Sequence, residues 1–249
     1  MEERIARFTA SNISRLLSES RGGGMGATAQ SYILELALQS IGIKEDIQTK
    51  EMLHGINNQI NAFESVVKPL YPNAVWFDQY LPINEWSGAS PDILIDGCPM
   101  DIKCPFHIDN FLEQCNQPPK KYYQQVQMQA MACKAEKCYL CFYLTAPEIW
   151  GSDEWREYPI ELEKRFKIFE YAKDEALHEE ISKKVELAEP LKQQVIKLLK
   201  EATEMDFEQF FNVQWEGYGY RKLKTCSNIF NLESIVRVGN EFYYQLKTK

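Results

Sequence analysis

The stretch from residue 88 to residue 105 constrains the fold of this chain more than any other. It reads Gly-Ala-Ser-Pro-Asp-Ile-Leu-Ile-Asp-Gly-Cys-Pro-Met-Asp-Ile-Lys-Cys-Pro, with Asp96-Gly97 between two apolar runs. An Asp-Gly pair in this setting indicates a two-residue hairpin turn, because both residues tolerate the positive φ that the turn needs. The sequence therefore predicts strands at residues 91–96 and 99–104.

Three charged side chains would meet on this hairpin. Side chains alternate between the faces of a strand, so Asp101 and Lys103 share one face while Ile102 points into the core. With Asp92, they offer two carboxylates and the Ile102 carbonyl as hard oxygen ligands for Mg²⁺ or Mn²⁺. Lys103 would orient or help to deprotonate a water molecule and offset charge on a phosphate. This set suits metal-assisted phosphodiester hydrolysis, although an ordinary surface hairpin fits the same residues.

Further segments surround the hairpin in a characteristic order. They are Arg-Ile-Ala-Arg-Phe-Thr-Ala-Ser at residues 4–11, a helical stretch that opens at His54-Gly55 and runs to Phe63, and Tyr-Tyr-Gln-Gln-Val-Gln at residues 122–127. With the Ser-Pro-Asp and Asp-Ile-Lys-Cys-Pro-Phe elements, they resemble the phage lambda exonuclease family, also called YqaJ-like viral recombinases. That family belongs to the PD-(D/E)xK nuclease superfamily. The similarity extends from about Arg4 to about Ala202.

The resemblance implies roles for residues of the hairpin and of the helix that follows it. Asp92 and Asp101 correspond to the metal-binding acids, with Asp101 standing where many relatives have Glu. Lys103 corresponds to the catalytic lysine. Gln125 matches an active-site glutamine that helps to place the water or the lysine. Without the resemblance, the helical spacing around Gln125 would suggest only the border of a buried face.

The resemblance also implies contacts with DNA near the start of the chain. Arg4 falls where the family has an arginine for the terminal 5′-phosphate, and Ser11 matches a nearby serine that contacts phosphate. Taken alone, Arg4 would be interpreted as a solvated charge near a chain terminus.

One position departs from the family pattern. Gln59 stands where many relatives have a metal-associated glutamate. A neutral amide is a weaker ligand than a carboxylate for a hard dication, so a second metal or full activity is in question. His54 and Glu64 are candidates to compensate, although a lone histidine near a helix start is more often structural.

Length and patterning predict an α/β fold with a mixed central β-sheet flanked by helices, and the resemblance implies a restriction-endonuclease-like core. The chain of 249 residues suffices for one large domain and a small appendage. We expect helices in residues 10–70 and 118–133, strands at 74–83, 137–145 and 156–161, and one or two long helices over 163–203, broken near Pro190. Residues 1–205 would form the nuclease domain and residues 206–249 an extension with a β-hairpin around Gly239-Asn240.

Seven cysteines and the absence of a signal peptide or membrane-spanning run predict a cytoplasmic protein with reduced thiols, in a bacterial host if the gene belongs to a phage or prophage. Cys133, Cys138 and Cys141 raise the alternative of an iron-sulfur cluster. Cys138 and Cys141 would lie on opposite faces of a strand, so buried thiols are the preferred interpretation.

The formal net charge of −8 argues against diffuse binding to DNA, but not against a local basic lining. Candidates for this lining are Arg15, Arg21, Lys120, Lys121, Arg221, Lys222 and Lys224.

The function implied by the resemblance is Mg²⁺-dependent 5′-to-3′ degradation of one strand of duplex DNA, leaving 3′ single-stranded tails for recombination. The resemblance further implies a ring-shaped homotrimer and a single-strand annealing protein as partner. Two alternatives remain: an endonuclease of the RecB-like or restriction type on the same core, and a DNA-binding protein whose nuclease site has decayed, as Gln59 suggests.

Overall fold

The computed structural model describes residues 5–21, 24–42, 49–145 and 161–202, together with three strands at residues 220–222, 232–238 and 241–246. The chain divides into two compact units. One unit is Asp46–His178, and the other combines Met1–Glu45 with Glu179–Lys249.

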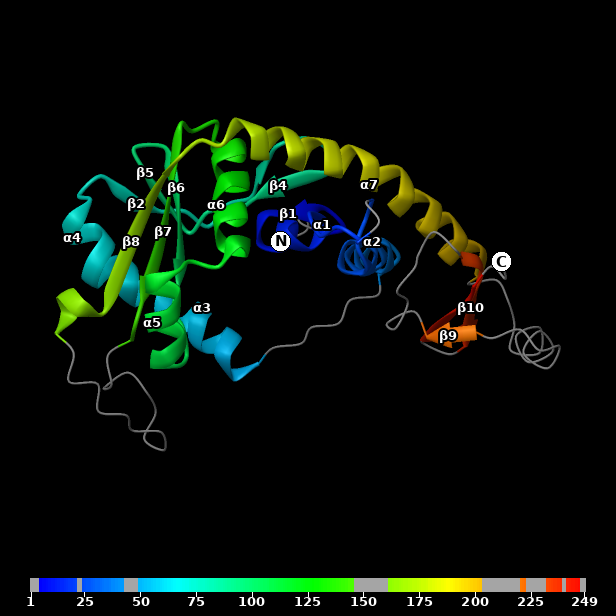
Figure 1. Cartoon of the computed structure of the whole chain (residues 1–249), viewed down its shortest axis with the longest axis horizontal. Coiled ribbons are helices and arrows are strands. Elements are labelled where there is room, and N and C mark those ends of the chain that lie inside the picture. Colours follow the sequence, from blue (N-terminus) through cyan, green and yellow to red (C-terminus); the bar gives the residue numbers. More distant parts are fainter. Residues whose placement is uncertain are drawn as a thin grey trace. The chain divides into compact units, whose positions relative to one another are not determined.

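A five-stranded mixed sheet forms the centre of the Asp46–His178 unit (Figure 1). Its order is β2 (Ala74–Trp76), β5 (Ile93–Ile95), β6 (Cys98–Lys103), β7 (Lys137–Tyr143) and β8 (Phe166–Ala172). The β6–β7 pair is parallel and the other pairs are antiparallel. The helices α5 (Ile108–Asn116) and α6 (Lys120–Cys133) connect the parallel pair, as a parallel pair requires. The predicted mixed sheet is confirmed.

The predicted hairpin turn is confirmed between β5 and β6. Ile95 pairs with Cys98, so Asp96 and Gly97 alone form the loop. Both have positive φ, 49° for Asp96 and 83° for Gly97, which is the backbone of a type I′ turn.

Helices cover both faces of the sheet. On one face, α3 (Lys50–Ala62) and the π-helix η3 (Phe63–Val67) contribute to a core with Ile102 and Cys141; the short α4 (Lys68–Leu70) follows η3. On the other face, α5 and α6 pack against Cys138, Leu140 and Phe142. Cys138 and Cys141 thus lie on opposite faces, as predicted. Within the described ranges, no three His, Cys, Asp or Glu side chains are grouped to hold a metal, and the iron-sulfur alternative gains no support there.

Several predicted boundaries in this unit are wrong. The strand expected at 74–83 is two strands, β2 and β3 (Leu81–Pro82), because β2 pairs with the three-residue β5 while β3 pairs with β4 (Ser87–Ala89). The helix expected to open at His54 begins at Lys50, where the Thr49 hydroxyl accepts a hydrogen bond from the Met52 N–H. Of the strand predicted at 156–161, residues 156–160 lie outside the described residues, and Glu161 is not in a strand.

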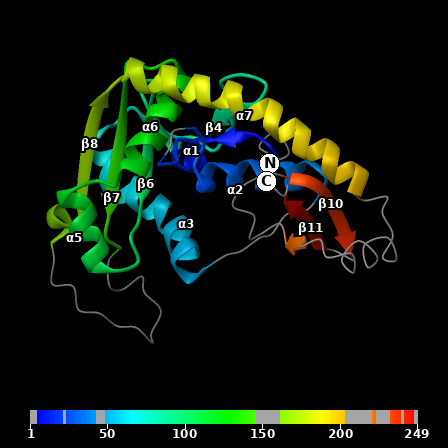
Figure 2. The ribbon, with the colours of Figure 1, turned by 45° about the vertical axis from the view of Figure 1, so that its right-hand side comes forward.

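The region 163–203 also differs from its prediction. Its first part forms the 3₁₀-helix η5 (Leu162–Lys164) and strand β8, because pairing with β7 over seven residues outweighs a helical charge pattern. The remainder is one helix, α7 (Glu175–Ala202), with Pro190 inside it. Figure 2 shows α7 as one continuous ribbon. Proline removes one helical hydrogen bond, and buried residues on both sides of it, Val185 and Val195 among them, keep the helix packed.

The other unit contains β1 (Phe8–Thr9), the 3₁₀-helix η2 (Ala10–Asn12), α1 (Ile13–Leu16) and α2 (Ala27–Ser40). Its strands β9 (Tyr220–Lys222), β10 (Leu232–Val238) and β11 (Glu241–Leu246) form an antiparallel sheet in which β10 and β11 pair on either side of residues 239–240. The strands of the predicted tail hairpin therefore form. The predicted boundary at residue 205 stays a prediction.

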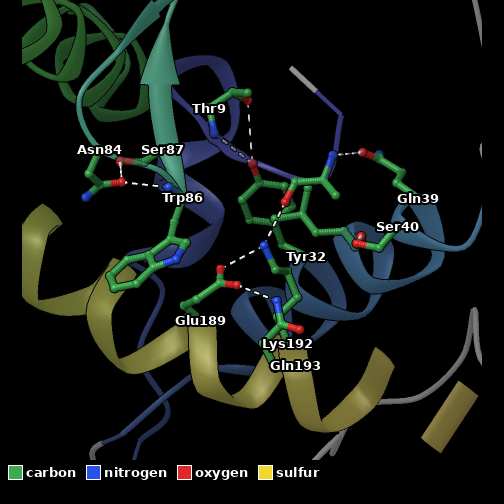
Figure 3. A network of polar contacts seen from close by, with 12 residues as sticks. Thr9, Tyr32, Gln39, Ser40, Asn84, Trp86, Ser87, Glu189, Lys192 and Gln193 are labelled. Atoms are coloured by element: carbon green, nitrogen blue, oxygen red, sulfur yellow. Dashed lines mark hydrogen bonds and ion pairs between the residues drawn. The ribbon is translucent and has the colours of Figure 1, made fainter. Parts of the chain in front are cut away.

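A buried ion pair fixes the start of the described chain in this unit. Glu189 and Lys192 lie 2.7 Å apart in α7, and both side chains are almost fully buried (Figure 3). Lys192 Nζ also donates to the carbonyl oxygen of Ala6, 2.8 Å away. Gln39 accepts from the Ala6 N–H at 3.4 Å. Ala6 has a φ of 58°, so these two contacts hold a backbone conformation that L-residues seldom adopt.

Among the described residues, no helix has the length and apolar character needed to cross a bilayer.

Two glycines of the Asp46–His178 unit should respond oppositely to substitution by alanine. A methyl group at Gly88 would overlap the Tyr80 hydroxyl and the Leu81 carbonyl, so Gly88→Ala should lower the free energy of unfolding by about 1–3 kcal/mol. Gly55 lies inside α3, and a methyl group there would meet its nearest atom, the Cys104 carbonyl oxygen, at 4.0 Å. Gly55→Ala should therefore stabilise the protein by about 0.5–1 kcal/mol. Urea denaturation measures both, and a stabilising Gly88→Ala would contradict the packing described for β4.

Candidate active site

The β5–β6 hairpin places the predicted acids beside each other in the Asp46–His178 unit. Asp92 directly precedes β5, and Asp101 and Lys103 lie on β6. Ile102 is buried with the core on the α3 side of the sheet, so its neighbours Asp101 and Lys103 face the α6 side, as the alternation predicts. Gln59 from α3 and Gln125 from α6 reach the same group of residues.

The carboxylate of Asp92 is fixed by a backbone donor and a side-chain donor. Its Oδ2 accepts from the Ile102 N–H at 2.7 Å and from Gln59 Nε2 at 3.2 Å. The same Gln59 nitrogen donates to the Ile102 carbonyl oxygen at 3.3 Å. The amide nitrogen of Gln59 therefore donates to two of the oxygens that we predicted as metal ligands.

The carboxylate of Asp101 is buried, and its two oxygens have different surroundings. Oδ1 accepts from Gln125 Nε2 and from Gln129 Nε2, the latter at 2.9 Å. Oδ2 lies 2.8 Å from Lys103 Nζ, but no well-directed hydrogen bond from a described residue reaches it. A buried carboxylate oxygen without such a bond is costly unless a cation completes its environment.

Lys103 forms an ion pair with Asp101 and lies 5.0 Å from the centre of the Tyr122 ring. Burial alone would lower the pKa of this lysine. The nearby carboxylates of Asp101 and Asp92 outweigh burial and raise the pKa above its usual value, so the ammonium is charged at neutral pH.

The donor set fits a small divalent cation. Asp92, Asp101 and the Ile102 carbonyl provide oxygen ligands, and Asp101 Oδ2, which accepts no well-directed hydrogen bond from a described residue, lies 2.8 Å from the Lys103 ammonium. Gln59 is the residue that fits less well, because its N–H groups face these oxygens. If the side-chain amide flipped, the Gln59 Oε1 would take the place of Nε2 and could act as a metal ligand.

The two residues considered as replacements for a glutamate at position 59 also belong to this unit, and their predicted role stays a prediction. His54 contacts Asn58 Nδ2 through Nδ1 at 3.2 Å and Thr145 Oγ1 through Nε2 at 3.4 Å. Burial lowers the pKa of His54, which favours a neutral ring. Glu64 is exposed on η3.

The residues predicted to contact DNA ends belong to the other unit. Arg4 lies outside the described residues. Ser11 is exposed in η2, with its hydroxyl 3.3 Å from that of Thr9. Their predicted roles stay predictions.

The candidate basic lining is only partly described. Arg15 forms an ion pair with Glu35 at 2.8 Å and lies over the Tyr32 ring. Arg21, Lys120 and Lys121 are exposed. Arg221 and Lys222 lie in β9, and Lys224 is outside the described residues.

Gln129 is a site residue that the sequence reasoning missed. It lies four residues after Gln125 on α6, the spacing that puts two side chains on the same helix face. It is fully buried, and its Oε1 has no hydrogen-bond partner in the described part of the chain. An unpaired buried acceptor costs about 1–3 kcal/mol, so a glutamine here is less stable than an apolar side chain that would fill the same space.

Comparisons with known proteins agree on one family and one fold. The family model for the YqaJ-like viral recombinase domain matches residues 1–136. An alkaline exonuclease from Laribacter hongkongensis has a similar structure, with a TM-score of 0.65 and 20% identity over 82% of this chain and 96% of its own. The same exonuclease in complex with dAMP gives a TM-score of 0.64 and 20% identity over 81% and 95% of the two chains.

A phage-related exonuclease from Haemophilus somnus 129PT is also similar, with a TM-score of 0.64 and 18% identity over 78% of this chain and 96% of its own. No curated protein matches the sequence. The structural matches show that this chain shares the fold of these exonucleases, which confirms the predicted fold class.

Replacing Gln59 by glutamate should have opposite effects with and without metal. Without metal, Gln59→Glu removes the N–H donor and sets a second carboxylate against Asp92 and the Ile102 carbonyl, so thermal stability in EDTA should fall. With Mg²⁺, the added anionic ligand should raise the melting temperature more than in the parent. Asn57→Asp, which adds the same charge at an exposed position of α3, is the control. Equal Mg²⁺-induced shifts in the Gln59→Glu variant and the parent would show that residue 59 lies outside the metal shell.

Proposed function

Because the chain belongs to the family of YqaJ-like viral recombinase domains, we propose that it is a Mg²⁺-dependent exonuclease acting on duplex DNA from a 5′-phosphorylated end. It leaves 3′ single-stranded tails that serve recombination by strand annealing. The observation that carries the proposal is the pairing of Asp92 and Asp101 around the Ile102 backbone, with a buried carboxylate oxygen that has no directed hydrogen bond in the described chain. The structural neighbours are exonucleases, which supports the proposal.

Three groups of the chain would hold the ion: the carboxylates of Asp92 and Asp101 and the carbonyl of Ile102. When bound, Mg²⁺, or Mn²⁺ in its place, would polarise a phosphodiester oxygen and make a water molecule more acidic. The net charge of two carboxylates and the Lys103 ammonium is −1, which suits one dication better than two.

Lys103 and Gln125 act on the reacting groups and on the ligands. The ammonium of Lys103, 2.8 Å from Asp101, can offset the charge that builds on the phosphate oxygens and can orient the attacking water. Gln125 donates to Asp101 Oδ1 and so keeps the other oxygen of that carboxylate directed toward the ion and Lys103.

Recognition of the DNA end is assigned to the other unit. Arg4 would form charge-assisted hydrogen bonds with a terminal 5′-phosphate, and Ser11 would add a neutral one. An enzyme that requires this contact begins at ends and proceeds 5′ to 3′.

The proposal extends to assembly and location. We place the enzyme in the cytoplasm of a bacterial host, as a ring-shaped homotrimer around DNA that supplies its product to a single-strand annealing protein. A ring concentrates basic groups on its inner surface, which reconciles a formal net charge of −8 with a DNA substrate.

A second candidate function is DNA binding without cleavage. The contacts of Gln59 with Asp92 and the Ile102 carbonyl favour it, because an amide donor at these oxygens competes with a cation. An endonuclease on the same core is a third interpretation, and both are separated from the exonuclease by incubating linear and closed circular duplex with Mg²⁺. Loss of linear duplex alone supports the exonuclease, cutting of circles supports the endonuclease, and intact DNA supports the binding protein.

Removing either acid should abolish cleavage while binding to duplex ends survives. Asp92→Asn and Asp101→Asn keep the side-chain volume but exchange a hard anionic ligand for a neutral amide, so the site should no longer hold Mg²⁺. Asp96→Asn, which removes the same charge at the exposed turn of the same hairpin, should cleave normally. Single-turnover cleavage and gel-shift binding measure the two properties. Undiminished Mg²⁺-dependent cleavage by Asp92→Asn or Asp101→Asn would contradict the metal assignment.

The end-recognition role predicts a preference that depends on Arg4. Linear duplex with a 5′-phosphate should be degraded faster than the same duplex with a 5′-hydroxyl. Losing one charged hydrogen bond costs about 1.5–3 kcal/mol, so Arg4→Ala should reduce the preference by roughly ten- to hundredfold. Arg7→Ala removes the same charge three residues later and should leave the preference unchanged. A parent protein that is indifferent to the end group would exclude the proposed polarity.

A further inference from the structure

The geometry points to Gln129 as a positioning residue for the metal ligand Asp101. The inference rests on the proposed function, because it concerns how the chain prepares this carboxylate to bind the ion. It adds a second amide to the one at Gln125, and its consequence for metal binding can be measured without DNA.

The nitrogen of Gln129 connects the two acids of the site. Gln129 Nε2 donates to Asp101 Oδ1 at 2.9 Å and lies 3.5 Å from the carbonyl oxygen of Ser90. Ser90 precedes Asp92 by two residues in the segment that leads into β5. One amide nitrogen thus contacts the side chain of Asp101 and the backbone that carries Asp92, and it fixes the separation of the two acids.

Two donors on the same oxygen fix the orientation of the Asp101 carboxylate. Gln125 and Gln129 are one turn apart on α6, and both donate to Oδ1. Rotation of the carboxylate would break both bonds, so Oδ2 stays directed toward Lys103. Mg²⁺ demands near-ideal geometry from its ligands, and a carboxylate held in one orientation binds it without further ordering.

Gln127 shows what a purely structural glutamine of this helix looks like. It is as fully buried as Gln129, but both ends of its amide are used. Its Nε2 donates to the Ala172 carbonyl at 2.8 Å, and its Oε1 accepts from the Asp174 N–H at 3.0 Å. Gln129 has only its donor end engaged among the described residues. It is therefore oriented for the carboxylate, and not for packing.

The test is a titration of the full-length, metal-free protein with Mg²⁺ and with Mn²⁺ by calorimetry, in the absence of DNA. Gln129→Met keeps a similar volume but removes the donor, and the dissociation constant should rise by about 10- to 100-fold, the usual effect of losing a partner of a metal ligand. Gln127→Met is the matched control. It should lower the melting temperature in EDTA and leave the dissociation constant as in the parent.

The outcomes separate the inference from the function on which it rests. Equal dissociation constants for Gln129→Met and the parent would overturn the positioning role while leaving the metal site intact. Equal weakening by Gln127→Met and Gln129→Met would also overturn it, because the effect would then belong to the packing of α6. A parent that binds neither ion would contradict the proposed function itself.

A second variant covers the case in which Gln129→Met does not fold. Gln129→Asn retains an amide but withdraws it by one methylene group, so it should still weaken metal binding. Parent-like affinity in that variant would overturn the positioning role.

Discussion

The hydrogen bond between the Asp92 carboxylate and the Ile102 N–H is the contact on which the rest of the site depends. Strand β5 is only three residues long, and its backbone pairing with β6 ends at Ile93 and Met100. Beyond that pair, the Asp92 side chain takes the place of a backbone acceptor at 2.7 Å. The two strands are thereby held together at the end opposite their turn. The same hydrogen bond places Asp92 beside the backbone of β6, which carries Asp101. One contact therefore closes the hairpin and brings the two acids together.

The hydrogen-bond donors around these carboxylates are mostly neutral amides, although arginine or lysine side chains could also donate to them. Gln59, Gln125 and Gln129 all donate to Asp92 or Asp101, and they come from helices on both faces of the sheet. At Asp101 both neutral donors use Oδ1 and leave the charge of the carboxylate in place, so the attraction for a dication is retained, whereas the Gln59 amide at Asp92 competes with a cation. An arginine or lysine in these places would satisfy the same oxygens but would repel the ion. The ammonium group of Lys103 contributes a positive charge to this group of residues, and it lies 2.8 Å from Asp101 Oδ2.

The parts that the sequence predicted well depend on local rules, and the parts it missed depend on tertiary contacts. The Asp96-Gly97 turn, the alternation along β6 and β7 and the helix at residues 120–133 follow from backbone preferences and periodicity. Residues 166–172 carry charges that suggested a helix, yet pairing with β7 decides their conformation. The i,i+4 spacing places Gln129, but not Gln127, on the helix face of Gln125, yet the contact of Gln129 with Asp101 is visible only in the structure. The role of Arg4 rests on family resemblance alone.

The parallel pairing of β6 with β7 has a consequence for the order in which this centre can assemble. Parallel neighbours cannot be joined by a tight turn, so the chain crosses the sheet through α5 and α6 between β6 and β7. The amides that hold Asp101 are 24 and 28 residues further along the chain, on the second of these helices. During synthesis Asp101 therefore emerges before the two amides that orient it, whereas Gln59, which donates to Asp92, precedes the hairpin. Closing loops of this length costs chain entropy, which the contacts between Asp101 and α6 help to repay.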